Sequence, residues 1–235
     1  MKLYVGTSGY SYKEWKGSFY PQSISASQML PYYASHFPAV ELNNTYYRLP
    51  EHSTVENWRT QVPKNFRFSV KAPQSITLFR RLKDVGWQTK RLLETASVLE
   101  DRLGALLFRM PEDMKKDLER LESFLKELPK DTPAAFEFRH QTWFDDEVFE
   151  LLRSYNRVLV VSDTDEIPTN HIDKTADWGY VRLRRVRYSK ADLTAWVKRI
   201  RAQKWKTAFV FFKHEDEGTG PKLAAQFINL SNNPR

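Results

Sequence analysis

Ala-Ala-Phe-Glu-Phe-Arg-His-Gln-Thr-Trp-Phe, residues Ala134–Phe144, is the stretch that decides how this chain folds. It begins as an apolar, strand-forming run and ends in ionisable and aromatic side chains. Because side chains alternate between the two faces of a strand, we expect Glu137 and Arg139 on one face and Phe136 and Phe138 on the other. A buried carboxylate is costly unless it is paired or hydrated. The stretch therefore indicates either a structural ion pair or a functional site at a strand end.

The same pattern recurs along the chain, in eight short runs that are nearly continuous in apolar or β-branched residues. The predicted strands are Leu3–Gly6, Ala39–Leu42, Phe66–Val70, Gly104–Phe108, Ala134–Phe138, Val158–Val161, Gly179–Leu183 and Thr207–Phe212. Strands of this composition are typical of a parallel sheet that is covered on both faces.

Helical patterns lie between these runs. The clearest is an apolar stripe with 3.6-residue spacing from Met114 to Leu128, flanked by charges. Ser53 and Glu56 form a capping-box signature for the second helix, and Ser189 with Asp192 is well placed to begin the seventh. The interval 163–178 carries only a weak pattern, with room for a short turn of helix.

Eight alternations of strand and helix favour an α/β fold with right-handed crossovers. In a chain of 235 residues they predict a (β/α)8 TIM barrel of eight parallel strands with surrounding helices, as a single domain over residues 1–235. An open doubly wound sheet is the alternative. Its dinucleotide fingerprint would follow the first strand, but the segment 6–9, Gly-Thr-Ser-Gly, is too short for it.

Composition limits the chemistry. The chain has no cysteine, which excludes disulfides, thiolate metal sites and a cysteine nucleophile. Its formal net charge is +8, which favours anionic partners such as DNA or RNA, although charge alone does not establish a function.

No apolar run approaches the roughly 18 residues that cross a bilayer, and no signal sequence precedes the first strand, so we expect a cytoplasmic protein without a membrane partner. The oligomeric state stays open.

Active sites of TIM barrels lie at the carboxyl ends of the strands. Ionisable residues gather at these positions, where apolar side chains would be ordinary. The candidate catalytic residues are Glu41, Lys71, Glu137, Arg139, His140 and Asp163. The strand ends also supply candidate substrate-binding residues, namely Ser8, Asn43, Arg109, Arg182, Arg184 and Lys213. Their convergence on one rim is the strongest indication of a site.

Several of these residues also have purely structural interpretations. Glu41 could pair with Lys71 or Arg139 inside the barrel. Lys71 could be a Schiff-base or acid/base lysine, but a charge partner is the commoner role. His140 could simply cap a strand end. For a metal, His214 and Glu215 are weak candidates because no histidine pair has ligand spacing.

A divalent metal ion bound by oxygen ligands remains a further option. The carboxylates that could hold Mg²⁺ or Mn²⁺ are those of Glu41, Glu137 and Asp163.

The loop after the first strand is dense in aromatic residues. Tyr10, Tyr12 and Trp15 stand between Gly9 and Gly17. Such rings could stack on bases or sugars above the mouth of the barrel. The alternative is that they pack on a neighbouring loop as part of the core.

Long motifs in this chain resemble the domain-of-unknown-function 72 family, the YecE-like proteins. The motifs are Gly-Thr-Ser-Gly-Tyr-Ser-Tyr (6–12) with Trp-Lys-Gly-Ser-Phe-Tyr-Pro (15–21), Val-Glu-Leu-Asn-Asn-Thr-Tyr-Tyr (40–47), Phe-Ser-Val-Lys (68–71), Phe-Glu-Phe-Arg-His-Gln-Thr-Trp-Phe (136–144) and Tyr-Val-Arg-Leu (180–183). The resemblance runs from residue 3 to about residue 225 and implies a TIM barrel. It implies no settled reaction. By analogy of shape with apurinic-site endonucleases it suggests DNA.

The family motifs imply functional roles for nine residues, among them two that the strand ends do not supply, Tyr47 and Trp143. The nine are Glu41, Asn43, Tyr47, Lys71, Glu137, Arg139, His140, Trp143 and Arg182. The chain departs from the pattern at three places. Thr77-Leu78 replaces a Thr-His pair, Arg109 replaces a glutamine, and the segment 212–215 reads Phe-Lys-His-Glu instead of an asparagine-rich form. These changes make the rim more basic.

Three functions are consistent with the sequence. The first is an enzyme that hydrolyses phosphodiesters or acts on another phosphate-bearing substrate, with Glu41 or Glu137 as general base or metal ligand and Lys71 and Arg139 on the phosphate. The second is a carbohydrate hydrolase with Glu41 and Glu137 as its paired acids and Trp15 and Trp143 as sugar platforms. The third is a barrel that binds nucleic acid without catalysis.

Overall fold

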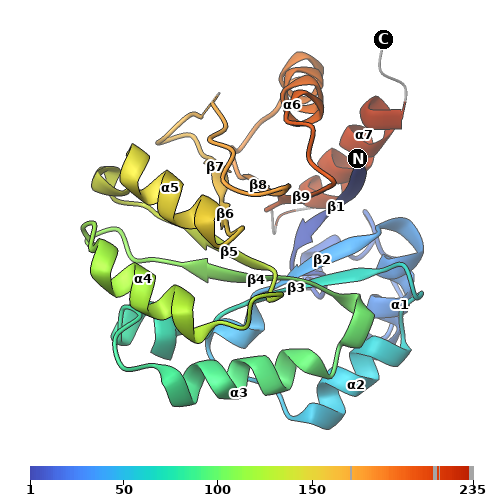
Figure 1. The fold of residues 1–235 in the computed structure, drawn as a ribbon. Helices are drawn as coiled ribbons and strands as arrows, with labels where there is room; N and C mark the ends of the chain where they lie inside the picture. Colours follow the sequence, from blue (N-terminus) through green and yellow to red (C-terminus); the bar gives the residue numbers. More distant parts are fainter. Residues whose placement is uncertain (170, 214–215, 217, 233–235) are drawn as a thin grey trace.

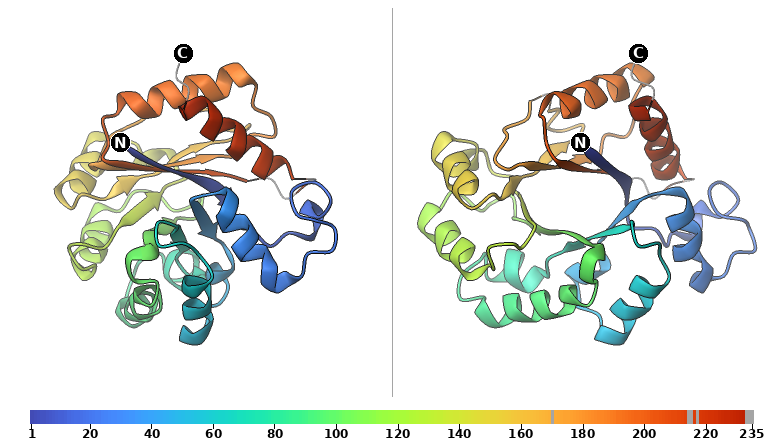
Figure 2. Two further views of the ribbon diagram at one scale, coloured as in Figure 1. Left: turned by 90° about the vertical axis from the view of Figure 1, so that its right-hand side faces the viewer. Right: turned by 45° about the vertical axis from the view of Figure 1, so that its right-hand side comes forward.

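The computed structural model describes residues 1–169, 171–213, 216 and 218–232. At its centre, parallel strands curl into a nearly closed barrel, and the helices lie around the outside (Figures 1 and 2). The strands are β1 (Lys2–Ser8), β2 (Ala39–Leu42), β3 (Arg67–Lys71), β4 (Leu103–Arg109), β5 (Ala134–Glu137), β6 (Val158–Leu159), β7 (Val161–Asp163), β8 (Trp178–Leu183) and β9 (Thr207–Phe212). The predicted α/β barrel is confirmed.

The strand order shows how the barrel closes. Hydrogen-bonded neighbours follow the order β6-β5-β4-β3-β2-β1-β9-β8-β7. The two outermost strands are parts of one predicted strand, Val158–Val161, which Val160 interrupts. β6 pairs with β5 and β7 pairs with β8, so a single short segment joins the two ends of the sheet. The nine strands are therefore the eight strands of the prediction, with the sixth in two pieces.

Helices follow the strands in the order that the sequence predicts. Seven α-helices are described: α1 (Ala26–His36), α2 (His52–Thr60), α3 (Gly86–Ser97), α4 (Leu118–Glu127), α5 (Asp146–Ser154), α6 (Lys190–Ala202) and α7 (Thr219–Asn232). Shorter turns of helix are η1 (Lys13–Trp15), η2 (Asn44–Tyr46), the π-helix η3 (Ser75–Phe79), η4 (Glu100–Arg102) and η5 (Gln141–Trp143). The described residues between β7 and β8 form no helix, in keeping with the weak pattern there.

Capping explains where two of these helices begin. Ser189 and Asp192 form the predicted capping box at α6, with a 3.1 Å hydrogen bond from the Asp192 backbone N–H to Ser189 Oγ. The capping box predicted for the second helix is wrong. α2 begins at His52, one residue before Ser53, and its N-cap is Glu51. Ser53 therefore lies inside the first turn, where its side chain cannot cap the helix.

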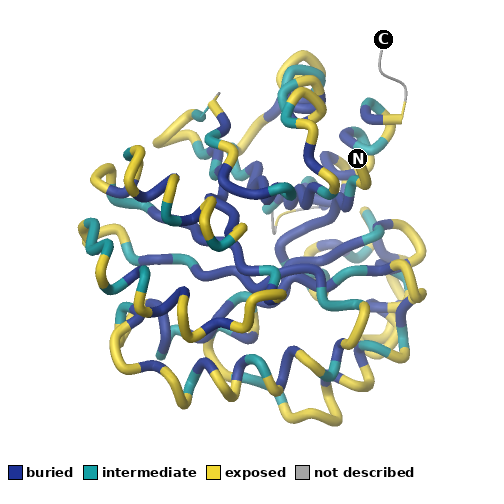
Figure 3. The backbone as a smooth tube through the Cα atoms, in the orientation of Figure 1, coloured by how far each residue is buried: buried dark blue, intermediate teal, exposed yellow. Residues whose placement is uncertain are grey.

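The strands have an apolar core on each side. One core lies between the sheet and the helices, and the other lies inside the barrel. In Figure 3 the strands are almost wholly buried, and the exposed residues face outwards from the helices. The interior core consists of Tyr4, Ala39, Ala105, Leu107, Ala135, Val158, Val160, Ala176, Tyr180, Phe209 and Phe211. Two residues beyond these on several strands, on the same inward face, stand the charged residues of the site. Among the described helices, none is long and apolar enough to cross a membrane.

Candidate active site at the carboxyl ends of the strands

A buried ion cluster closes the interior of the barrel at the carboxyl ends of the strands. Glu41 of β2, Glu137 of β5 and Arg182 of β8 are each at most 2% exposed. Arg182 donates from Nη2 to Glu41 Oε1 at 2.7 Å and from Nη1 to Glu137 Oε2. Each of the three residues stands two positions after an interior residue of its strand, Ala39, Ala135 or Tyr180 respectively. The predicted convergence of these strand ends is therefore present.

Hydroxyl groups complete the hydrogen bonding of Glu41. Ser8 of β1 donates to Glu41 Oε1 at 2.7 Å, and Tyr180 donates to Glu41 Oε2 at 2.7 Å. Because the proton of Tyr180 is committed to the carboxylate, the 2.6 Å contact between Tyr180 and Ser69 has Ser69 as the donor. Every residue in this chain of contacts is buried. A buried charge that lacked its hydrogen bonds would be costly, so the hydroxyl groups stabilise the carboxylate.

The pKa values of the two glutamates show which roles they can fill. Burial is the largest single influence and would raise both pKa values, but Arg182, the other nearby arginines and the hydrogen bonds together outweigh it. They hold the pKa of Glu41 below its usual range and that of Glu137 at about 2. A carboxylic acid of such strength carries no proton at neutral pH and is a poor base. Arg182 also bridges the two carboxylates. This arrangement argues against the carbohydrate hydrolase, which needs one glutamate as a protonated acid.

Three partly exposed cations lie beside the buried cluster. Arg109 Nε is 3.4 Å from Glu137 Oε2, and the Arg109 side chain is 27% exposed. Burial, followed by the charge of Arg182, lowers the pKa of Arg184 to about 10. Burial, then Arg182 and Arg109, lowers the pKa of Lys71 to about 8. Since Arg182 already balances one of the two glutamates, the described residues of this cluster carry more positive than negative charge.

Arg139 and His140 lie on the rim and not in the cluster. β5 ends at Glu137, so strand alternation does not extend to Arg139. Its guanidinium forms an ion pair with Glu112. His140 is the N-cap of η5, and its Nδ1 accepts a 3.2 Å hydrogen bond from the Thr142 N–H. The capping interpretation of His140 is therefore the one that the structure supports.

Asp163 is the main correction to the predicted cluster. It is fully buried but faces α6, away from the barrel interior. Its carboxylate accepts hydrogen bonds from Arg185 Nε at 2.9 Å and from the Tyr188 hydroxyl at 2.9 Å. Val161, on the same face of β7, packs in the outer core, and Asp163 stands opposite Leu183 in the register. Asp163 thus fastens the loop after β8, and the carboxylates available to the mouth are only Glu41 and Glu137 among the predicted three.

The tryptophans predicted to contact substrate are core residues. Trp15 is 0% exposed and packs against Tyr12 with ring centroids 4.8 Å apart. Trp143 is also 0% exposed, stacks on Phe138 at 4.2 Å and donates from Nε1 to the Met114 carbonyl at 2.6 Å. Neither ring can reach a ligand in this structure, so both predictions are corrected.

The other aromatic residues of the first loop pack in the same way. Tyr12 is half-buried and donates to the Ser8 carbonyl at 2.8 Å, and half-buried Tyr10 accepts at its carbonyl from the Tyr20 hydroxyl. The packing interpretation of this loop, rather than the stacking one, is the one that the structure supports.

The remaining candidates are spread over the rim. Asn43 directly follows β2 and is half-buried, and Tyr47 is 75% exposed. Lys213 follows β9 and is half-buried. His214 and Glu215, the weak metal candidates, lie outside the described residues. Within the described part of the chain, no group of three side chains is arranged to hold a metal ion.

Sequence reasoning missed Tyr180 and Tyr46, and it read Ser69 from the third strand end without counting it among the candidate site residues. Tyr180 and Ser69 stand two residues before Arg182 and Lys71, so period-two alternation could have placed both beneath the site. Tyr46 has its ring centroid 3.8 Å from Lys71 Nζ. It lies in η2, a turn of helix that no pattern in the sequence indicated.

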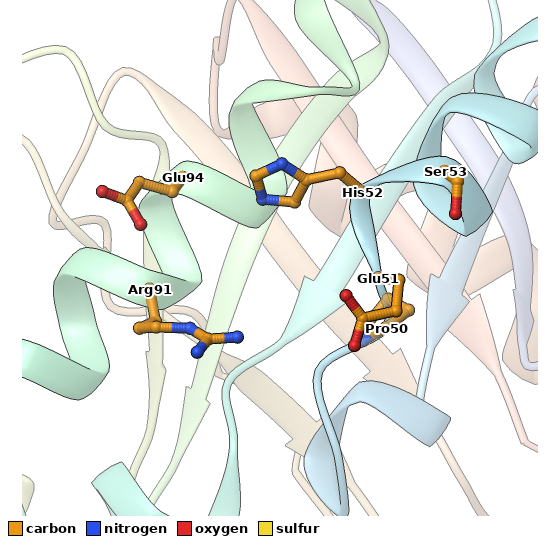
Figure 4. A pocket seen from close by; sticks show the side chains of 6 residues that line it. All are labelled: Pro50, Glu51, His52, Ser53, Arg91 and Glu94. Carbon is orange, nitrogen blue, oxygen red and sulfur yellow. The ribbon is translucent and has the colours of Figure 1, made fainter.

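A hollow on the outside of the barrel contains none of the predicted site residues. It has a volume of about 430 Å³ and is lined by Pro50, Glu51, His52, Ser53, Arg91 and Glu94. Figure 4 shows the two α3 side chains on one side and the residues at the start of α2 on the other. Its charges are mixed, so it selects neither anions nor cations.

Comparison with known proteins places this geometry in a family. The family model described as "Protein of unknown function DUF72" matches residues 4–235. A Bacillus subtilis protein named UPF0759 protein YunF is 26% identical over 97% of this chain and 94% of its own length. The Escherichia coli K12 protein named UPF0759 protein YecE is 31% identical over 60% of this chain and 50% of its own length.

Solved structures agree with these sequence relatives. A DUF72 family protein from Thermotoga maritima superposes with a TM-score of 0.87 at 29% identity, over 99% of this chain and all of the other. A DUF72 family protein from Enterococcus faecalis gives a TM-score of 0.82 at 20% identity, over 99% of this chain and 96% of the other. A methyltransferase from Methanosarcina mazei, at 10% identity and a TM-score of 0.51, shares the fold alone.

Proposed function

This chain belongs to the DUF72 family of proteins of unknown function, and we propose that it is an enzyme acting on a phosphate-bearing substrate, with nucleic acid as the leading candidate. The observation that carries the proposal is the unbalanced charge at the mouth. Arg182 is shared between two glutamates, and Lys71, Arg109 and Arg184 remain beside them. A phosphate dianion would balance this excess.

The geometry of the cations supports phosphate over a neutral ligand. Guanidinium groups match phosphate oxygens with two parallel hydrogen bonds, and a partly dry site strengthens each of them. Arg182 Nε is buried and has no hydrogen-bond partner among the described residues. The glutamates then serve to hold Arg182 in place, which replaces the general-base role expected for them.

Exposed apolar residues on the surrounding loops favour nucleic acid over a small phosphate ester. Tyr47 follows β2, Phe79 follows β3 and Phe144 follows β5, with exposed fractions of 75%, 68% and 49%. Aromatic rings next to cations are the combination that binds single-stranded nucleic acid, with the rings on the bases and the cations on the backbone. These rings are offered for the stacking that the sequence suggested for Tyr10, Tyr12 and Trp15, which pack against their own loop.

Binding without catalysis is the second candidate, because the same rim and rings would suffice for it. The two functions differ in turnover. Incubation with phosphomonoesters, single-stranded oligonucleotides and abasic-site oligonucleotides, with and without divalent metal, separates them. Turnover supports the enzyme, and salt-sensitive binding with no product supports the binding barrel.

The test of phosphate recognition uses matched arginine and lysine variants. Arg184→Met removes a cation at the mouth, whereas Lys64→Met removes an exposed cation that precedes β3, at the opposite end of the barrel. We expect Arg184→Met to weaken binding of a phosphorylated nucleoside about tenfold, in keeping with loss of one charge-assisted hydrogen bond. Equal effects of the two variants would overturn the proposal.

A further inference from the structure

Lys71 occupies an unusual position for a lysine in this barrel. It ends β3 on the inward face, two residues after Ser69, which contacts the interior residue Tyr180 at 2.6 Å. Within the described part of the chain, no carboxylate oxygen lies within 4.0 Å of Lys71 Nζ. The charges of Arg182 and Arg109 lower the pKa of Lys71, and those of Glu41 and Glu137 act in the opposite direction. The amine thus lies near two arginines, with Glu41 and Glu137 beyond ion-pair distance.

The neighbouring turn fixes the direction of this side chain. Thr45 is buried and donates from Oγ1 to the Lys71 carbonyl at 2.7 Å, which ties η2 to the end of β3. The next residue, Tyr46, then lies with its ring 3.8 Å from Lys71 Nζ. The face of the ring attracts the protonated ammonium and so fixes the direction of the side chain. Tyr46 is accordingly a positioning residue for Lys71.

We propose that Lys71 is a nucleophile that forms an imine with an aldehyde or ketone that also carries phosphate. This deepens the proposed function and rests on it for the phosphate. In the step, the amine nitrogen adds to the carbonyl carbon, the C=N bond forms and the C=O bond breaks. The carbonyl oxygen leaves as water with both amine protons, so no oxidant or further reactant is needed.

The surroundings of Lys71 keep part of the amine ready for this reaction. With its pKa lowered to about 8 from the ordinary 10.5, roughly one-tenth of the amine is unprotonated at pH 7, against well under a thousandth for an ordinary lysine. Burial is the larger cause, and the positive charges of Arg182 and Arg109 follow. The same arginines would hold the phosphate of the substrate, which places the carbonyl beside the amine.

Two sources supply this chemistry, an open-chain sugar phosphate and a nucleic acid that lacks a base, whose deoxyribose opens to an aldehyde between phosphates. The experiment treats the full-length protein with ribose 5-phosphate, an abasic-site oligonucleotide or pyridoxal 5′-phosphate. Sodium cyanoborohydride traps any imine as a stable amine, and peptide mass spectrometry locates it. Pyridoxal 5′-phosphate serves as a general probe of the amine, and the faster label of the other two arms identifies the source.

We expect Lys71 to be labelled at least tenfold faster than the exposed Lys64 at pH 7.5. Lys71→Arg, which keeps the charge, should abolish this label, and Lys64→Arg should leave it unchanged. Tyr46→Ala should slow it while Tyr46→Phe retains it. Labelling of Lys71 no faster than of Lys64 overturns the inference.

Two controls distinguish failure of the imine from failure of phosphate recognition. If phosphate compounds bind and compete with one another but Lys71 is not labelled, the imine is overturned and the proposed function stands. A Lys71 label that neither inorganic phosphate nor Arg184→Met reduces would support the nucleophile and overturn the phosphate site.

Discussion

Tyr180 and Glu41 are joined across the inside of the barrel by a 2.7 Å hydrogen bond, although 139 positions separate them in the chain. They come from β8 and β2, which are not neighbours in the sheet. The bond therefore holds opposite walls of the barrel at a fixed distance beneath the mouth. It also leaves Arg182, two residues after Tyr180, directed at the same carboxylate.

Removing the Tyr180 hydroxyl should destabilise the barrel. Tyr180→Phe leaves Glu41 Oε2 without its donor and Ser69 without its acceptor. We expect a loss of about 1–3 kcal/mol in the free energy of unfolding, measured by urea denaturation. Tyr47→Phe, whose hydroxyl is exposed, is the control and should change stability by less than about 0.5 kcal/mol. Equal losses would show that the buried bond contributes nothing.

Arg182 should matter more, because its loss strands two buried carboxylates. We expect Arg182→Met to cost about 3–5 kcal/mol in unfolding free energy. Adding Glu41→Gln and Glu137→Gln should recover part of this loss, since the carboxylates then no longer need a cation. A triple variant less stable than Arg182→Met would contradict the electrostatic explanation.

Acid should weaken the protein through Glu137. The pKa of Glu137 is about 2 in the folded protein and 4.5 ordinarily, so the folded state favours the charged form. Its stabilisation is complete above pH 4.5 and is lost as the pH falls from there towards 2, by about 3 kcal/mol in all. Urea denaturation at a series of pH values should show a shallower decline in Glu137→Gln. If the unfolding free energy fell equally with pH in the wild type and in Glu137→Gln, the stabilisation would not come from Glu137.

Two adjacent aromatic residues separate packing from recognition. Trp143 is 0% exposed and Phe144 is 49% exposed. We expect Trp143→Ala to lower stability by about 3–5 kcal/mol. Phe144→Ala should change stability by less than about 0.5 kcal/mol but weaken oligonucleotide binding, by about 1–3 kcal/mol if a base stacks there. Fluorescence anisotropy at fixed salt measures the binding. Unchanged binding in Phe144→Ala would remove this ring from the nucleic-acid surface.

The sequence predicted the barrel because its information is local and repeated. Apolar strands such as Gly104–Phe108 and helical stripes such as that of α4 each report their own element, and their alternation specifies the topology. Residues on strand ends could also be placed on a common rim. The convergence of Glu41, Glu137 and Arg182 follows from that rule alone.

The face on which a side chain lies and the residue with which it pairs were harder to predict. Asp163 looked equivalent to Glu41 and Glu137, but the break at Val160 and the register with Leu183 turn it towards α6. Trp15 looked like an exposed platform, yet a loop between two glycines can fold its rings inwards and bury them. Which guanidinium reaches which carboxylate depends on positions far apart in the chain, and no local pattern encodes it.

The interruption at Val160 gives the cylinder a seam. Two residue pairs attach β6 to β5 and three attach β7 to β8, whereas six attach β1 to β9. Amide protons along this seam should therefore exchange with deuterium sooner than those of β1. The ion pair between Arg182 of β8 and Glu137 of β5 spans this seam, so it is the contact that holds the two sides of the wall together.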